Sequence, residues 1–196
     1  IRECHCIGTV CGFNFLFGRN RVGTPDLLER YFPGHSVVID EIRGQTGVIS
    51  ASSIRTFLAE GKIKEANQML GYEYALHGPV IHGLGNGKTF GYPTANLSFP
   101  DDKFIPAFGV YYTHCIIDGK EYDALTDVGT KPTVTVGQNV ICESFLIFGD
   151  GDLYGKEMLV RFVDYVRPEM KFSSIDALVN RIRMDVDSVI HRKGQI

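Results

Sequence analysis

The segment from Gly83 to Asn96 combines residue types that suit a site for a nucleotide and its metal ion. Its four glycines within nine positions allow the backbone to approach a ligand closely. Lys88 adds a positive charge, and Pro93 stiffens an extended stretch that carries Thr94 and Asn96. Because alternate residues of an extended segment point to the same side, these two neutral oxygen ligands converge. We expect the segment to hold nucleotide phosphates and Mg²⁺.

A P-loop is the first alternative for this segment, and its context does not fit. That motif requires Gly, four residues, Gly, Lys and then Ser or Thr at the start of a helix. His82 occupies the position of the first glycine, and Gly91 and Pro93 follow too soon for a helix to begin. Two alternatives stay open: a hairpin loop with a solvated lysine, and Thr94 and Asn96 as turn-stabilising caps.

Glu143 is the third residue that could do chemistry. It lies in an apolar run over residues 140–148, and alternation places it on the same side as Ile141 and Phe145. A carboxylate in such surroundings is costly to bury unless it is paired or used. We therefore predict that Glu143 is a general base, with a carboxylate at the rim of a barrel as the alternative.

The composition excludes several classes of protein. Of the 196 residues, 44% are hydrophobic and 22% are charged, which is typical of a globular chain with a core. A net charge of −3 argues against nucleic acid or an acidic membrane as the main partner. No apolar run approaches the ~18 residues that a membrane-spanning helix requires.

The cysteines indicate the redox environment of the chain, and its first residue indicates how the chain begins. The five cysteines are an odd number in strand-like runs, so we interpret them as reduced cytosolic thiols. Cys4 and Cys6 lack a second pair spaced for zinc, which favours free thiols over a metal site. The chain opens at Ile1 without Met or a signal peptide, and we interpret it as the interior of a longer protein.

The two parts of the chain differ in their pattern of predicted elements. Upstream of Gly71, strands near residues 6–13 and 35–42 alternate with helices that begin at Pro25 and after Ser52-Ser53, which predicts an α/β fold with a parallel sheet. Downstream, short apolar runs separated by turn signals predict an antiparallel barrel or sandwich. A final helix after Ser173 carries an apolar stripe from Ile175 to Ile190.

The motifs together resemble the bacterial bifunctional riboflavin kinase/FMN adenylyltransferases, also called FAD synthetases, in the C-terminal two thirds or so of their length. The resemblance covers residues 78–196 and implies a six-stranded antiparallel barrel of the riboflavin kinase type with a C-terminal helix. The matching residues are, in order, Gly83–Asn96 with its Pro-Thr-Ala-Asn core, Pro106, Gly109–Tyr111, Gly129–Thr133, Glu143, Asp152–Gly155 and Arg167–Phe172.

The resemblance also implies a role for each matching residue. Thr94 and Asn96 correspond to ligands of Mg²⁺, and Glu143 corresponds to the base that takes the proton of the ribityl 5′-hydroxyl. The other residues fall into three groups: Gly83 and Lys88 at the ATP phosphates, Leu146, Phe148 and Tyr154 at the adenine nucleotide, and Arg167, Met170 and Phe172 at the flavin. Lys88 and Asp127 depart from the residues common in relatives, and we expect neither to change the chemistry.

The upstream part resembles the end of the adenylyltransferase module, with substitutions. Residues 12–18 are similar to a family motif but carry Asn14 and Leu16 in place of Asp and Arg. Residues 50–55 resemble its nucleotide motif, through Ser52, Ser53 and Arg55. The His-x-Gly-His motif that should precede both is absent, so we expect the chain as given to make no FAD, and leave the activity of a longer parent protein open.

The sequence therefore predicts two parts with one reaction. Residues 1–70 are expected to form the incomplete end of a nucleotidyltransferase-like, Rossmann-type α/β domain, and residues 71–196 a riboflavin kinase domain. The expected reaction converts ATP and riboflavin to ADP and FMN in a cytoplasmic monomer or weak oligomer. Two alternatives stay open: a non-catalytic flavin- or nucleotide-binding barrel, and a kinase for another small molecule.

Overall fold

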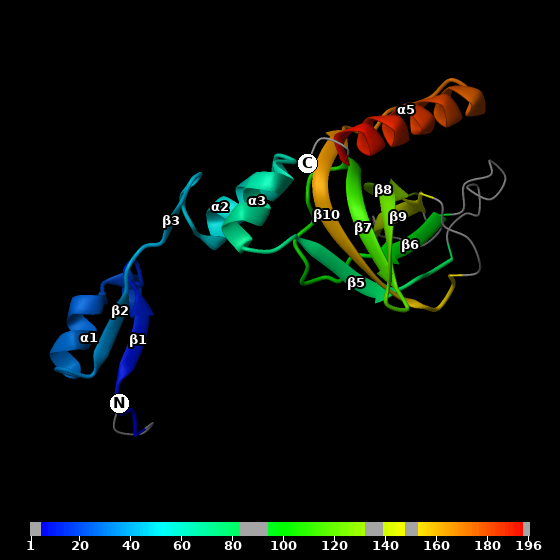
Figure 1. Cartoon of the computed structure of the whole chain (residues 1–196). Coiled ribbons are helices and arrows are strands. Elements are labelled where there is room, and N and C mark those ends of the chain that lie inside the picture. The colour runs from blue at the N-terminus through cyan, green and yellow to red at the C-terminus, as the bar shows by residue number, and fades with distance from the viewer. Residues whose placement is uncertain (1–4, 83–93, 132–138, 148–152, 194–196) are drawn as a thin grey trace. The chain divides into compact units, whose positions relative to one another are not determined.

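The computed structural model describes residues 5–82, 94–131, 139–147 and 153–193 (Figure 1). The chain divides into two compact units, residues 1–49 and residues 50–196. Each unit is described by itself. None of the helices in the described ranges is both long and apolar enough to cross a lipid bilayer.

The first unit is built around two short parallel strands. β1 (Thr9–Gly12) pairs with β2 (Ser36–Ile39), and α1 (Pro25–Tyr31) connects them with proline in its first turn. The short 3₁₀ turn η1 (Arg19–Arg21) and the pair β3 (Arg43–Gly44) and β4 (Gly47–Val48) complete it. The parallel pairing predicted from the sequence is confirmed, while a Rossmann-type domain stays a prediction.

Two helices open the second unit. α2 (Ala51–Ala59) begins at Ser50, whose Oγ accepts a hydrogen bond from the backbone N–H of Ser53 at 3.1 Å. The predicted start after Ser52-Ser53 was wrong, because Ser50 provides the cap and both serines lie inside the helix. α3 (Ile63–Leu70) follows and ends at Gly71, whose φ of 77° is the left-handed conformation that suits glycine.

Asn67 of α3 ties these helices to the barrel. Its side-chain amide donates to the Phe162 carbonyl at 2.8 Å, and its carbonyl oxygen accepts from the Tyr74 N–H at 2.7 Å. Leu58 and Ile63 also belong to the core cluster of the barrel. The contacts of the structure thus join residues 50–70 to the barrel, and the family-based boundary after residue 70 stays a prediction.

The barrel is one antiparallel sheet of six strands, as predicted. Its order is β5 (Ala75–Pro79), β10 (Glu157–Arg167), β7 (Gly109–Ile117), β8 (Lys120–Lys131), β9 (Asn139–Leu146) and β6 (Thr94–Ser98). The two edge strands approach each other through an antiparallel bridge between Ile81 and Asn96, with Ile81 N–H donating to the Asn96 carbonyl at 2.8 Å. The barrel is therefore nearly closed.

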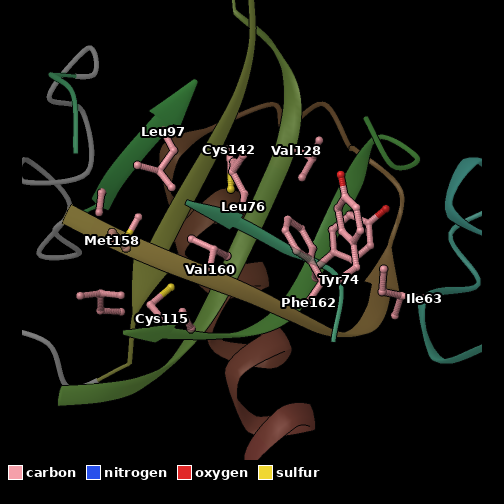
Figure 2. Packing of buried hydrophobic residues seen from close by; sticks show 14 of the residues in the cluster. Ile63, Tyr74, Leu76, Leu97, Cys115, Val128, Cys142, Met158, Val160 and Phe162 are labelled. Atoms are coloured by element: carbon pink, nitrogen blue, oxygen red, sulfur yellow. The ribbon is translucent and has the colours of Figure 1, made fainter. Parts of the chain in front are cut away.

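The interior of the barrel holds the main hydrophobic core. Residues of β7, β8 and β9 alternate between this core and the outer face, as the two-residue period of a strand requires, whereas β10 has two shifts of register. Figure 2 shows part of the cluster, which includes Leu76, Leu97, Val128, Met158, Val160 and Phe162. A chain of buried hydroxyls crosses three strands, from Thr113 to Thr126 at 2.6 Å and from Thr126 to Ser144 at 2.8 Å. Each buried hydroxyl thus has a hydrogen-bond partner.

α5 (Ile175–Lys193) packs on the outer face of the barrel (Figure 1). Val189 of α5 packs against Val110 and Leu125, which alternate with residues of the interior core. Ser174, one residue after the predicted cap, accepts from the Ala177 N–H at 3.2 Å through its Oγ. Ile182 and Val186 of the predicted stripe pack against this cluster, whereas Ile175 and Ile190 at its two ends are exposed.

Candidate active site

Strands β6 and β9 bring together three residues singled out in the sequence. The register pairs Asn96 with Glu143 and Thr94 with Phe145. Residues directly opposite each other in an antiparallel pair share a face, so Thr94, Asn96 and Glu143 lie on one face of the sheet. The neighbouring Ala95 and Leu97 point into the core. The convergence of Thr94 and Asn96 predicted from alternation is confirmed.

A hydrogen bond joins Thr94 to Glu143. Thr94 Oγ1 donates to Glu143 Oε1 at 2.7 Å, and Asn96 beside them is 3% exposed. A hydroxyl has one hydrogen and two lone pairs. Since the hydrogen is directed to the carboxylate, the lone pairs of Thr94 Oγ1 face elsewhere and are suited to accept a cation. The arrangement fixes the carboxylate of Glu143 next to two neutral oxygen groups.

The donor set at this face fits Mg²⁺ that also binds phosphate. Among the residues described, no group of three or more His, Cys, Asp or Glu side chains is arranged to hold a metal ion. The oxygens of Thr94 and Asn96 could hold a cation here together with oxygens of a bound nucleotide. Mg²⁺ is commonly held in this way, with few protein ligands and with phosphates and waters completing its shell.

Asp127 belongs to the same face, although the sequence analysis gave it no role. The register of β8 and β9 pairs Asp127 with Glu143. Two carboxylates directly opposite each other on neighbouring strands repel unless other groups compensate. The only sequence signal was an acidic residue in an apolar strand, and its pairing with Glu143 depended on a register that the sequence did not give. Asp127 is therefore a further residue of the candidate site.

α5 borders this site. Phe145 and Leu125, which are paired across β9 and β8, pack against the same cluster as Val189 of α5. Phe145 lies two residues from Glu143 on the same face, and Leu125 lies two residues from Asp127. The helix thus covers the part of the outer face that adjoins the two carboxylates.

The residues predicted at the adenine nucleotide have different surroundings. The Tyr154 ring is half-buried and stacks on the His82 ring, with centroids 3.8 Å apart and planes at 24°. Leu146 is 2% exposed and lies in the core of the barrel, on the face opposite to Glu143. Gly83, Lys88 and Phe148 lie outside the described residues. The nucleotide roles of all five residues stay predictions.

The residues predicted at the flavin follow the end of β10. Met170 is 49% exposed, and Phe172 lies beneath the guanidinium of Arg167. Arg167 itself forms an ion pair with Asp185 of α5, which the sequence analysis missed. The signal was present in the sequence, since Asp185 lies three residues after Ile182 and next to Val186, where a helical stripe is apolar. A buried acid in such a stripe requires a basic partner.

The residues predicted as the remnant of the adenylyltransferase lie in different units. Asn14 lies in the turn after β1 of the first unit. Ser52, Ser53 and Arg55 lie in the first turns of α2 in the second unit, where Ser53 contacts the capping Ser50 and Arg55 is exposed. Their shared role in binding a nucleotide stays a prediction.

The two pairs of cysteines described differ in their surroundings. Cys6 is exposed and Cys11 is partly buried, whereas Cys115 and Cys142 are buried in the core, and all four are free thiols. Burial raises the pKa of Cys115 to about 11 and raises the pKa of Cys142 well above its ordinary value. Free thiols rather than disulfides therefore account for these cysteines.

Comparison with known proteins identifies the family. The family model for riboflavin kinase (Flavokinase) matches residues 70–192. The bifunctional riboflavin kinase/FMN adenylyltransferase of Listeria monocytogenes is 31% identical over 183 residues, which cover 92% of this chain and 58% of the relative. The enzyme of the same name from Bacillus subtilis is 31% identical over 185 residues, which cover 92% of this chain and 58% of the relative.

A solved structure is similar over most of the chain. It is a crystal structure described as a macrolide-efflux protein from Streptococcus pneumoniae, with 34% sequence identity and a TM-score of 0.80. The match covers 90% of this chain and 57% of that chain. The present chain thus spans less than two thirds of each of these relatives.

Proposed function

The chain belongs to the riboflavin kinase family, and from this premise we propose that it transfers the γ-phosphoryl group of ATP to the 5′-hydroxyl of riboflavin, giving FMN and ADP. The observation that carries the proposal is the hydrogen bond between Thr94 and Glu143, beside the buried Asn96. Phosphoryl transfer asks a protein mainly for positioning and for compensation of charge. One carboxylate next to two neutral oxygen groups suits both tasks.

Glu143 is the proposed general base. Its carboxylate accepts the proton of the ribityl 5′-hydroxyl as the oxygen of that hydroxyl attacks the γ-phosphorus. The hydrogen bond from Thr94 holds one carboxylate oxygen in place, which would fix the position of the base. Asp127 opposite Glu143 adds negative charge to the site, which favours binding of a cation there.

Thr94 and Asn96 are the proposed ligands of Mg²⁺. The bound ion would neutralise charge on the β- and γ-phosphates of ATP. The Thr94 hydroxyl can bind Glu143 and Mg²⁺ at the same time, because it donates its hydrogen to Glu143 and keeps lone pairs that could coordinate the cation. Gly83 and Lys88 are proposed to cradle the phosphates with backbone N–H groups and a positive charge.

The remaining assignments complete the proposal for the substrates. The proposed lining of the adenine nucleotide consists of Leu146, Phe148 and Tyr154. The proposed segment over the flavin carries Arg167, Met170 and Phe172. We propose a cytoplasmic location and a monomer or weak oligomer. The names of the relatives also include FMN adenylyltransferase, and we propose that the polypeptide of residues 1–196 forms FMN without forming FAD.

A non-catalytic flavin carrier is the alternative from another class. A carrier would use the aromatic residues but would not need the paired Thr94 and Glu143. The assay that separates the two functions incubates the purified chain with riboflavin, ATP and Mg²⁺, and measures FMN by fluorescence chromatography. A kinase forms one ADP for each FMN. It forms no FMN when either ATP or Mg²⁺ is omitted. Flavin binding without FMN would establish the carrier, and transfer to another alcohol in a substrate panel would establish a different kinase.

Asn96→Ala tests the proposed metal ligands. Loss of one oxygen ligand should raise the Mg²⁺ concentration needed for half-maximal turnover by about tenfold, while the KM for riboflavin changes little. Titration of Mg²⁺ at saturating ATP, and of riboflavin at saturating Mg²⁺, measures the two effects separately. A larger change in the riboflavin KM than in the Mg²⁺ requirement would exclude Asn96 as a ligand.

A further inference from the structure

Arg167 marks the end of β10, and its guanidinium contacts three different parts of the chain. Nε donates to Asp185 Oδ2 of α5 at 2.8 Å, and Nη1 donates to the Pro168 carbonyl at 3.1 Å. The guanidinium also lies over the Phe172 ring, 5.8 Å from its centroid. Only 11% of the Arg167 side chain is exposed. This side chain therefore connects β10, the segment 168–172 and α5.

Asp185 is buried and forms ion pairs with two arginines. It is 2% exposed, and its second oxygen lies 2.9 Å from Nε of Arg181, one helical turn earlier. A carboxylate out of water is costly unless charged partners surround it, and two arginines do so here. Planar guanidinium groups offer several donors in a fixed geometry, which lysine cannot reproduce. The three residues Arg167, Asp185 and Arg181 are called the arginine clamp below.

The clamp joins α5 to β10 next to the apolar contacts that the helix makes on the outer face. Val189, one turn after Asp185, packs against Val110 and Leu125, and Phe145 packs against the same cluster. The strand register places Arg167 opposite Val110, Val110 opposite Asp127 and Asp127 opposite Glu143. The clamp and the candidate base thus belong to one row of residues across four strands. A shift of α5 would move the border of the site next to Glu143.

We propose that Arg167 is a positioning residue, which acts on flavin binding through Asp185 and Phe172 and does not itself contact the flavin. The clamp holds α5 and the segment 168–172 in place before the substrate binds, so that Phe172 and Met170 present a fixed surface to the flavin ring. This inference rests on the proposed function, because it assigns the role of the clamp to riboflavin binding. Its distinguishing feature is that the buried Asp185 matters as much as Arg167.

Asp185→Asn tests the clamp with an almost unchanged side-chain volume. Its expected effect is a riboflavin Kd and KM raised about tenfold or more, since loss of one partner leaves buried arginine charge uncompensated, with kcat within about threefold. The KM for ATP should stay within about twofold, because the clamp contacts the segment 168–172, which carries the residues proposed for the flavin. Arg167→Lys should shift the riboflavin constants in the same direction. In the double variant, the two increases should not multiply, because both remove the same contact.

Glu121→Gln is the matched control. Glu121 pairs with Arg161 of the same strand β10, but this ion pair is exposed and lies away from α5. It should leave both riboflavin constants unchanged. If Asp185→Asn fails to fold, Arg181→Gln replaces it, with a smaller increase in the same direction, because Arg181 is one third exposed.

The outcomes separate this inference from the proposed function. Riboflavin binding is measured directly by quenching of flavin fluorescence, so the clamp can be tested even without turnover. Absence of FMN from the unmodified chain would overturn the kinase assignment. A riboflavin Kd that rises in Arg167→Lys but stays unchanged in Asp185→Asn would overturn the clamp, because it would show that Arg167 contacts the flavin itself.

Discussion

The two units of the chain bury their apolar side chains to very different extents. In the barrel, Leu76, Val160 and Phe162 are at most 1% exposed. In the first unit, Val10 is 73% exposed and Val37 on the paired strand is 52% exposed. A two-stranded parallel sheet with one short helix cannot cover both of its faces, whereas a nearly closed sheet encloses its own core. The barrel therefore has a well-packed core, which suits a scaffold that must position a catalytic site.

Replacement of the candidate base should have the largest effect on FMN formation. It should also show that the second unit, and not the first, carries out the reaction. Glu143→Gln keeps the shape of the side chain but removes its ability to accept a proton, so kcat for FMN formation should fall by about 10²–10⁴ while riboflavin still binds. Asn14→Ala in the first unit is the matched change, and it should leave FMN formation unaltered. Steady-state kinetics of both variants measure the effect.

Either of two results would contradict this assignment. An unchanged kcat for Glu143→Gln would remove the carboxylate from the mechanism. A loss of FMN formation in Asn14→Ala would show that the first unit contributes to phosphoryl transfer, and the comparison between the units would fail.

Core truncations should show the same contrast in stability. The Phe162 ring is fully buried and meets the Tyr111 ring edge-on, with centroids 5.2 Å apart. Phe162→Ala should lower the free energy of unfolding by about 3–5 kcal/mol. Val10→Ala in the exposed sheet of the first unit should change it by less than about 0.5 kcal/mol. Urea unfolding followed by circular dichroism compares the two variants. Equal losses of unfolding free energy would mean that Val10 is as well packed as Phe162.

Thiol labelling gives a smaller and more local contrast. Cys6 is exposed, whereas Cys115 and Cys142 are buried with raised pKa values. Because the thiolate is the reactive form, the two core cysteines should react with a disulfide reagent at pH 8 about tenfold or more slowly than Cys6. Mass spectrometry of labelled peptides identifies each site. Rapid labelling of Cys142 in the folded chain would show that the barrel opens.

Local sequence patterns predicted an antiparallel barrel or sandwich and a shared face for Thr94 and Asn96, whereas the six strands of the barrel were implied by the family resemblance. Alternation in β6 placed Thr94 and Asn96 on one face, and the register with β9 confirms this. The apolar run around Glu143 predicted a strand, and β9 is that strand, while the use of the carboxylate stays a prediction. These predictions succeeded because they depend on the period of a single strand.

Features that depend on the pairing of distant segments could not be predicted. Asp127 joins Glu143 only through the register of β8 and β9, and Asp185 joins Arg167 across 18 residues and two elements. The orientation of α5 was also missed at its ends, where Ile175 and Ile190 fit the helical period but remain exposed. A helical period gives the direction of a stripe, but it does not show that Asp185 is buried within the stripe between two arginines.

The most direct test of the central claim is FMN formation by residues 50–196 alone. Every group proposed for phosphoryl transfer belongs to this unit, which also contains α2 and α3 packed on the barrel. The shortened chain should therefore phosphorylate riboflavin with a kcat within about twofold of the chain of residues 1–196. A fragment that unfolds cooperatively and binds riboflavin, but forms no FMN from ATP and Mg²⁺, would contradict it.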